Sequence, residues 1–428
     1  MTPHRLWEWE GRGFDAEQAI PRADADRLIR AAQGPAGRLK GAQRAFDLFP
    51  DRVSARNLVG IVAAGDVSCE ILPKIDREAT PAHPASLRRQ LISMLAVAHD
   101  LRIADDAATL LDTQQQTLLE ILITRFVALA EDAVRRGMPR LYVAHADDLP
   151  ALRGRLDPVR QFSALAGNPS RLACRYDVFS EDIALNQVMK AAILCLRLLA
   201  RSMANQRRLG ELALVYADVA TVARSQLRWD RIVPDRANAR WQPLLRLARL
   251  ILGDQFQNTT AGSADGFALL FDMNVLFERY VARLLAPIAD EAGWTLHAQG
   301  GRKPCLTGEN APKAGLFETE PDLRLERDGR VAMIVDTKWK CLADPAHEPK
   351  MCIDQADIYQ VMAYARVYGC NRLMLLYPHH AGLGRAMPVD FTVTGSGAPI
   401  TLTVATLDIS DHATARQGLI DILGLYGR

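Results

Sequence analysis

Two short hydrophobic segments joined by Asp-Gly constrain the fold of this 428-residue chain more than any other feature. Leu323 and Leu325 alternate with polar residues, as in a strand that buries one face. The run 331–335 is continuously apolar, as in a central strand that is buried on both faces. Asp328-Gly329 between the two segments is typical of a β-hairpin turn. The sequence therefore predicts two antiparallel strands, the second at the centre of a sheet.

Three charged residues stand at the open end of this predicted hairpin. Asp336 and Lys338 are two positions apart, so both side chains point to one face of their strand. A two-residue loop would turn the side chain of Asp322 to the opposite face. We therefore expect a three-residue loop, Arg327–Gly329, whose glycine is left-handed in a bulge and which pairs Asp322 with Ile334.

These residue types suit metal-dependent hydrolysis of a phosphodiester. Two carboxylates held on adjacent strands, Asp322 and Asp336, repel each other unless a cation neutralises them. Mg²⁺ prefers such oxygen ligands, and the backbone carbonyl of Thr337 is a candidate further ligand. The metal can polarise a phosphate and activate a water, while Lys338 stabilises the charged transition state. The alternative is an ordinary hairpin with an Asp336–Lys338 pair on its surface.

Two expected helices flank the hairpin and carry further polar residues. Glu278 lies on the preceding helix, where it is either a third acid for the metal or part of a solvated face. On the following helix, predicted at 354–368, Gln360 and Tyr364 are four residues apart and share a face with Asp357. This face either lines a polar site or belongs to a hydrogen-bonded amphipathic helix.

The pattern along the chain predicts a multidomain α+β protein in three parts. Residues 1–83 form a small β-rich unit, with strands at 57–63 and 67–72. Residues 84–260 are predicted to be helical, and a polar, glycine-rich stretch marks their end. Residues 261–428 alternate between strands and helices, which favours an α/β domain with a mixed sheet.

Composition excludes several classes of protein. Hydrophobic residues make up 49% and charged residues 24% of the chain, as in globular proteins. No apolar run approaches the roughly 20 residues of a membrane-spanning helix, and the first residues lack the apolar stretch of a signal peptide. The seven cysteines form no C-x-x-C pair. We therefore expect a cytoplasmic protein without disulfides and without a membrane partner.

The net charge of +2 is unevenly distributed. Residues 151–250 contain 17 Arg and Lys but 8 Asp and Glu. This excess of positive charge is consistent with a polyanionic partner for the middle segment, or with a solvated helical surface.

The order of these elements resembles the PD-(D/E)xK nuclease superfamily: a helix with Glu278, a strand with Asp322, a strand with Asp336-Thr337-Lys338, and a helix. Gln360 and Tyr364 on that last helix resemble the Gln-x-x-x-Tyr signature of its RecB-type branch. The resemblance implies a DNA endonuclease that uses Mg²⁺.

A narrower resemblance is to the McrC family, the nuclease subunits of McrBC modified-cytosine restriction systems. It extends over nearly the whole chain. The matching segments are EILPKI at 70–75, LRGRLD at 152–157, CRYDVFSEDIALNQ at 174–187, DMNVLFERYVARLL at 272–285, PDLRL at 321–325, IVDTKWK at 334–340 and DIYQVMAYA at 357–365.

McrC membership would imply a division of labour between two proteins in phage defence. The partner is McrB, an AAA+ GTPase that forms a hexameric motor and carries the reader of modified double-stranded DNA. That partner would bind GTP, and McrC would stimulate its hydrolysis of GTP. Consistent with this division, the sequence contains no G-x-x-x-x-G-K-[ST] segment for binding nucleotide phosphates.

The family also suggests a contact with the partner ring. An N-terminal β element of McrC enters the ring through a basic–Asn–aromatic tip that promotes GTP hydrolysis, and Arg56-Asn57-Leu58 resembles this tip. Leu58 departs from the usual aromatic residue. The alternative is that Arg56 and Asn57 merely form a turn before a strand.

Two other functions compete with that of a restriction nuclease subunit. The first is a DNA-processing nuclease that acts alone or with a different partner, although such an enzyme has no need of the N-terminal β unit. The second is a non-catalytic scaffold that bridges a motor to DNA. The Asp322, Asp336 and Lys338 set argues against a scaffold, since bridging does not require these groups on one face.

Overall fold

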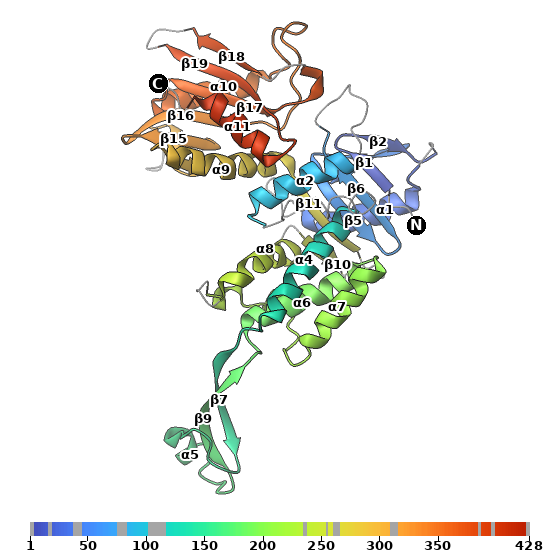
Figure 1. Ribbon diagram of the computed structural model, residues 1–428, viewed down its shortest axis with the longest axis vertical. Coiled ribbons are helices and arrows are strands. Elements are labelled where there is room, and N and C mark those ends of the chain that lie inside the picture. Colours follow the sequence, from blue (N-terminus) through green and yellow to red (C-terminus); the bar gives the residue numbers. More distant parts are fainter. Residues whose placement is uncertain are drawn as a thin grey trace. The chain divides into compact units, whose positions relative to one another are not determined.

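The computed structural model divides the chain into two compact units, residues 1–118 with 255–428 and residues 119–254 (Figure 1). The first unit is therefore built from both ends of the chain. It does not follow the expected domain boundaries, since it includes residues 84–118, and the three functional domains stay a prediction. The described residues are 4–15, 19–36, 45–74, 84–101, 117–233, 238–253, 256–259, 266–308, 316–383, 387–394 and 399–424.

Within the described ranges, the first sheet of the larger unit has five strands in the order β1-β6-β5-β11-β10. Strand β1 runs parallel to β6, and the other neighbours are antiparallel. The two strands expected at 57–63 and 67–72 are confirmed. The strands are β1 (His4–Trp7), β5 (Leu58–Ala64), β6 (Val67–Leu72), β10 (Phe256–Thr259) and β11 (Gly266–Asp272).

A glycine allows β5 and β11 to pair closely. Gly60 has a φ of 136°, in the range that favours glycine, and a Cβ atom there would lie 2.0 Å from the carbonyl oxygen of Leu269. Such a contact is impossible, so any side chain at position 60 would push the two strands apart. The chain thus needs glycine at this point to join its N-terminal and later strands in one sheet.

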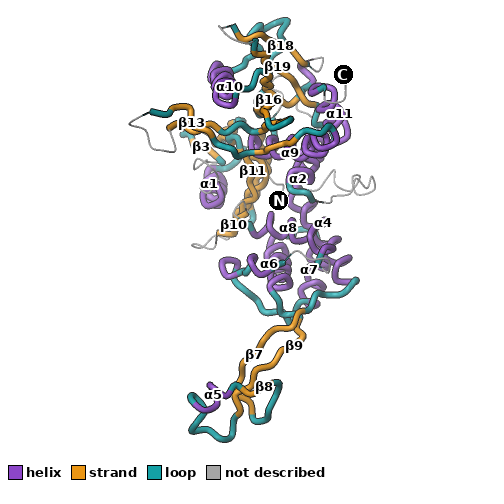
Figure 2. Tube along the Cα trace, turned by 90° about the vertical axis from the view of Figure 1, so that its left-hand side faces the viewer, coloured by secondary structure: helices purple, strands orange, loops and turns teal. Residues whose placement is uncertain are grey.

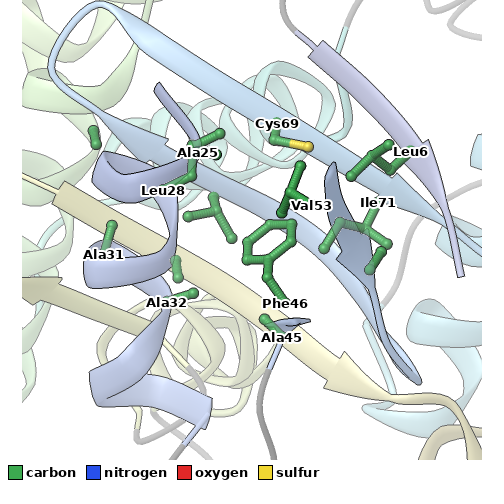
Figure 3. Packing of buried hydrophobic residues seen from close by; sticks show 14 of the residues in the cluster. Leu6, Ala25, Leu28, Ala31, Ala32, Ala45, Phe46, Val53, Cys69 and Ile71 are labelled. Carbon is green, nitrogen blue, oxygen red and sulfur yellow. The ribbon is translucent and has the colours of Figure 1, made fainter. Parts of the chain in front are cut away.

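Helix α1 (Arg22–Ala36) covers this sheet through an apolar stripe. Ala25, Leu28 and Ala32 recur at helical spacing and are buried. Figure 3 shows this stripe facing Phe46 and Val53 of a smaller sheet and residues of β6. The smaller sheet consists of β2 (Gly11–Gly13), β3 (Phe46–Leu48) and β4 (Arg52–Ala55).

A second large sheet carries the residues singled out in the sequence. As far as the chain is described, its order is β12-β15-β16-β17-β19-β18, with β16, β17 and β19 parallel and the remaining pairs antiparallel. This confirms the mixed sheet expected for the C-terminal part. The strands are β12 (Thr295–Ala298), β15 (Leu323–Arg327), β16 (Arg330–Thr337), β17 (Arg372–Pro378), β18 (Pro388–Val393) and β19 (Ile400–Leu407).

Helices lie on both faces of this second sheet. Figure 2 shows α10 on one side and α9 and α11 on the other. A two-stranded ribbon, β13 with β14, packs beside α10. These elements are α9 (Met273–Glu291), β13 (Lys303–Leu306), β14 (Leu316–Thr319), α10 (Gln355–Tyr368) and α11 (His412–Leu423). The expected helix that carries Glu278 begins at Met273, directly after β11.

The hairpin of β15 and β16 has a different loop from the one expected. Asp328 and Gly329 form a two-residue loop in which both residues have positive φ, so the three-residue loop was wrong. A bulge compensates: Glu326 pairs with Val331 and Leu325 with Met333, which leaves one extra residue in β16. With the two-residue loop alone, Asp322 would face away from Asp336. The extra residue in β16 shifts the pairing by one position, so both side chains lie on the same face.

The smaller unit combines helices with an extended ribbon. Among its described residues, β7, β9 and β8 form a three-stranded antiparallel sheet within a region that the sequence analysis predicted to be helical. Strand β7 is largely exposed on both faces, so it lacks the apolar alternation that reveals a strand. The elements are α4 (Leu118–Arg135), β7 (Leu141–Leu149), β8 (Arg155–Leu156), α5 (Pro158–Phe162), β9 (Leu172–Ser180), α6 (Ala184–Leu199), α7 (Met203–Val215) and α8 (Gln242–Leu252).

The α+β multidomain class predicted from the sequence is confirmed. Helix α2 (Pro84–Ala98) joins the larger unit, where it packs on α9. No helix in the described ranges is long and apolar enough to cross a membrane.

Candidate active site

One buried and one partly buried carboxyl group lie at the end of the β15–β16 hairpin. Asp336, near the end of β16, is 0% exposed. Asp322 stands just before β15 and accepts two hydrogen bonds through Oδ2, from the backbone N–H and the hydroxyl of Thr337, each at 2.8 Å. The side chain of Asp322 is therefore fixed to the end of the neighbouring strand, as the sequence analysis expected.

Burial and mutual repulsion make both carboxyl groups hard to ionise. Burial is the main cause that raises the pKa of Asp336 to about 7, followed by the negative charge of Asp322. Burial likewise raises the pKa of Asp322, against the opposing effect of its hydrogen bonds to Thr337. Such a pair is relieved by a cation placed between its members.

Lys338 lies against these carboxyl groups. Its ammonium nitrogen is 2.8 Å from Asp336 Oδ2 and 3.6 Å from Asp357 Oδ1. Partial burial lowers the pKa of Lys338, but the attraction of Asp336 and the other carboxylates outweighs it, so the pKa lies above its ordinary value. Lys338 is consequently a permanent cation at neutral pH.

A chain of hydrogen bonds from helix α10 orients the lysine. Tyr364 donates its hydroxyl proton to the carbonyl of Glu320 at 3.2 Å and accepts from Gln360 Nε2 at 2.6 Å. The other end of that amide, Oε1, accepts from Lys338 Nζ at 2.9 Å. Burial raises the pKa of Tyr364, so its hydroxyl keeps the proton on which this arrangement depends. The polar face expected on this helix does line the site.

Asp357 connects the same helix to a second lysine. The pair Asp357–Lys340 is 2.7 Å apart, and Lys340 also contacts Asp354 at 2.5 Å. Lys340 thereby ties the segment after β16 to the N-terminal end of α10. Asp357 is thus shared between two lysines, of which Lys338 also contacts Asp336.

Glu278 is close to this constellation without joining it. Its Oε1 accepts a hydrogen bond from Gln299 Nε2 at 2.6 Å, and the backbone N–H of Gln299 donates to the carbonyl of Asp322 at 3.0 Å. The structure therefore places Glu278 two hydrogen-bonding steps from Asp322, and its role as a third acid stays a prediction. Among the described residues, no group of three or more His, Cys, Asp or Glu side chains is arranged to hold a metal.

Asp336 nevertheless has the properties of a ligand for a hard cation. Within the described part of the chain, its Oδ1 has no hydrogen-bond donor, and its Oδ2 has only the Lys338 ammonium. Mg²⁺ is commonly held by one or two carboxylates together with waters and substrate phosphates. Asp322, Asp336 and the carbonyl of Thr337 fit this ligand set better than an all-protein cage.

Sequence reasoning missed a buried acid that supports the site from the first sheet. Glu8 follows β1, is 1% exposed, and accepts hydrogen bonds through Oε2 from Trp339 Nε1 at 3.0 Å and from the backbone N–H of Lys74 at 3.1 Å. Trp339 directly follows Lys338 and packs edge-on against Phe277. No local pattern could have revealed this contact, because it joins residues 331 positions apart.

The expected partner-binding tip is only partly exposed. Leu58 is 0% exposed and lies in β5, where it belongs to the apolar core, so an exposed tip at Leu58 is contradicted. The buried strand needs an apolar residue there, which explains why the position is not a surface contact. Arg56 is exposed and paired with Asp47 at 2.5 Å. A role for Arg56 and Asn57 in partner binding stays a prediction.

Comparisons with known proteins agree with this architecture. The family model for the McrBC 5-methylcytosine restriction system component matches residues 53–378. A solved chain from the half-complex of a tetradecameric assembly of Thermococcus gammatolerans McrB AAA+ hexamers with bound McrC has a TM-score of 0.70 at 20% identity, over 98% of this chain and 100% of that chain. A chain from the cryo-EM structure of the T. gammatolerans McrBC complex has a TM-score of 0.52 at 24% identity, over 67% of this chain and 87% of that chain. At these identities the likeness concerns the fold alone. No curated protein matches the sequence.

Proposed function

This chain belongs to the family of McrBC 5-methylcytosine restriction system components, and we propose that it is the subunit that cuts DNA. The observation that carries the proposal is the meeting of a buried carboxyl group, Asp336, and a partly buried one, Asp322, with the cationic Lys338. Structural ion pairs seldom bury two acids beside each other, because their repulsion costs stability. A hydrolytic site that binds a cation and a phosphate has use for both features.

Asp322, Asp336 and the backbone carbonyl of Thr337 would hold Mg²⁺. When bound, the ion supplies a Lewis acid for the scissile phosphate and lowers the pKa of a coordinated water. Asp322 is held in place for this role by its two hydrogen bonds to Thr337. Asp336 keeps an oxygen that no described residue satisfies.

Lys338 would stabilise negative charge on the phosphate. Its pKa lies above the ordinary value because of the neighbouring carboxylates, which fits the role of a positive charge better than that of a base. Gln360 and Asp357 hold the ammonium group beside Asp336, so little reorganisation is needed when the phosphate arrives. Glu278 and Tyr364 complete the set of supporting residues that we assign to the site.

The remaining activity of a restriction complex would come from a partner. The T. gammatolerans relatives are complexes of McrB AAA+ hexamers with bound McrC, and we infer a similar hexameric AAA+ GTPase as the partner here. That partner would bind GTP and recognise modified cytosine in double-stranded DNA, since this sequence contains no G-x-x-x-x-G-K-[ST] segment. This chain would stimulate the GTPase and cut the DNA in the cytoplasm.

The proposal is tested by co-expressing this chain with the AAA+ protein encoded beside it. Cleavage of cytosine-methylated plasmid is measured with GTP and Mg²⁺ for the wild type, for Lys338→Ala and for the matched control Lys350→Ala, which changes an exposed lysine. We expect Lys338→Ala to lose at least about 100-fold of the cleavage rate and to retain GTP hydrolysis. The control should cut like the wild type.

Other outcomes would each point to a different function. Equal cleavage by Lys338→Ala and the wild type would refute the assigned site. GTP hydrolysis by a stable complex that never cuts would favour the non-catalytic scaffold. Cleavage by the chain alone, without GTP, would favour a DNA-processing nuclease that needs no motor.

A further inference from the structure

A pocket of about 500 Å³ lies beside the proposed active site, between α2, α9 and β12. Its walls are largely formed by small side chains, including Ala282 and Ala286 of α9 and Ala298 of β12. Polar groups stand around them, among them Arg279 and Arg283. A volume of this size accommodates a small ligand or a short stretch of a polymer chain.

The two arginines outnumber the one carboxylate that lines the pocket, Glu278, and so give the pocket a positive charge. Arg279 and Arg283 are four residues apart, so they project from one face of α9 about 6 Å apart along its axis. Both are exposed, and neither forms an ion pair with a carboxylate in the described ranges. By contrast, Arg302 and Arg324 on nearby segments each pair with a glutamate at 2.8 Å.

A partly buried histidine lies near the same two arginines. The pKa of His99, next to the pocket residue Ala98, is lowered to about 4, first by burial and then by the charges of Arg279 and Arg283. Protonated histidine would add a third positive charge at this place. The arginines therefore act together on their surroundings, and an anion in the pocket would meet both.

The pocket is joined to the active site by hydrogen bonds. Glu278 and Gln299, which line it, bond to each other at 2.6 Å. The backbone N–H of Gln299 donates to the carbonyl of Asp322 at 3.0 Å. The pocket that contains the arginines therefore adjoins the segment that carries Asp322.

We propose that this pocket binds the phosphodiester backbone of the DNA strand next to the scissile bond, with Arg279 and Arg283 as its phosphate ligands. The inference rests on the proposed nuclease function and adds a substrate subsite to it. Guanidinium groups bind phosphate oxygens in pairs of hydrogen bonds, and the small alanines leave room for the sugar. Contacts of this kind position a strand and do not read its sequence.

DNA binding, measured without cleavage, tests the subsite. The full chain is titrated against a fluorescent 20-base-pair duplex with Ca²⁺ in place of Mg²⁺, between 50 and 200 mM salt. This duplex length and these salt concentrations are on the order of those at which the contribution of phosphate contacts to affinity can be measured. The test variant is Arg279→Gln/Arg283→Gln. The matched control, Arg52→Gln/Arg416→Gln, removes two exposed arginines that lie outside the basic segment 151–250.

We expect the test variant to bind DNA roughly tenfold more weakly than the wild type. The slope of log K against log salt concentration should fall in magnitude by about two. The control should keep the wild-type slope. Arg279→Lys/Arg283→Lys should restore most of the slope, because lysine keeps the charge. Unchanged thermal unfolding temperatures would show that none of these substitutions disturbs the fold.

If the test variant keeps the wild-type affinity and slope, the subsite is overturned. The nuclease proposal still stands, because cleavage by Lys338→Ala tests it separately. If the wild-type chain binds labelled GTP and the test variant does not, while DNA binding is unchanged, the pocket binds a nucleotide and the subsite is also overturned. Failure of the wild type to bind DNA, alone and with its AAA+ partner, would overturn both proposals.

Discussion

Glu8 makes the stability of this chain depend on pH in a way that one substitution can isolate. Burial is the main cause that raises its pKa from an ordinary 4.5 to about 7, against the hydrogen bonds from Trp339 and Lys74 and with a further increase from the charge of Asp272. Because the folded-state pKa is raised, the neutral acid is favoured on folding. The contribution of Glu8 is fully present below pH 4.5 and is lost as the pH rises to about 7.

The size of the effect follows from the pKa change. At roughly 1.4 kcal/mol per pH unit, the wild type should lose about 3 kcal/mol of stability through Glu8 across this window. Glu8→Gln keeps an oxygen that can accept from Trp339 and Lys74 but cannot ionise. We expect the variant to resemble the wild type near pH 4.5 and to become the more stable protein by about pH 8.

Thermal unfolding of both proteins, followed by circular dichroism at pH 5, 6.5 and 8, measures this difference. A chain of this length should gain up to about 2 °C for each kcal/mol, so the unfolding temperatures should separate by several degrees between pH 5 and 8. Asp328→Asn, at a hairpin position that is 93% exposed, is the control and should follow the wild type. A difference between Glu8→Gln and the wild type that does not change with pH would refute the reasoning.

Three further predictions concern the frame and the supporting residues. Glu70→Ala should lower the free energy of unfolding by about 3–5 kcal/mol in urea denaturation, because it leaves the buried Arg88 guanidinium without its partner at 2.6 Å. Tyr364→Phe should slow cleavage about tenfold at saturating DNA with little change in KM, since the Gln360 amide loses the hydroxyl that fixes it. Insertion of one alanine between Val335 and Asp336 should place the new residue opposite Asp322, turn Asp336 to the other face and abolish cleavage while circular dichroism shows a folded chain.

The sequence revealed the acids of the site but gave the wrong reason for their meeting. Periodicity and the Asp328-Gly329 turn were sufficient to predict the hairpin. The prediction that Asp322 and Asp336 share a face was also correct, but a bulge in β16, and not the length of the loop, places them there. A bulge needs no special residue when the extra position adopts an ordinary backbone conformation, so Ala332 carries no signal in the sequence.

Contacts between distant parts of the chain were beyond sequence reasoning for a different reason. Strand β11 joins the N-terminal sheet, and Glu8 reaches Trp339, because elements far apart in the sequence are brought together in the larger unit. Periodicity reports which face of an element is buried and not which element buries it. The ribbon of β7 and β9 was missed because its exposed faces leave no apolar alternation to read.

The surroundings of Lys338 limit the chemistry that the site can perform. Asp336, Gln360 and Asp357 all present oxygen atoms to its ammonium group, and none presents a positive charge. Such an environment favours the protonated form, which agrees with the proposed role of the lysine as a positive charge. The first sheet contributes to this arrangement, since Glu8 holds the indole of Trp339 immediately after Lys338. The position of this cation is thus set from both sides, by helix α10 and by the N-terminal strands.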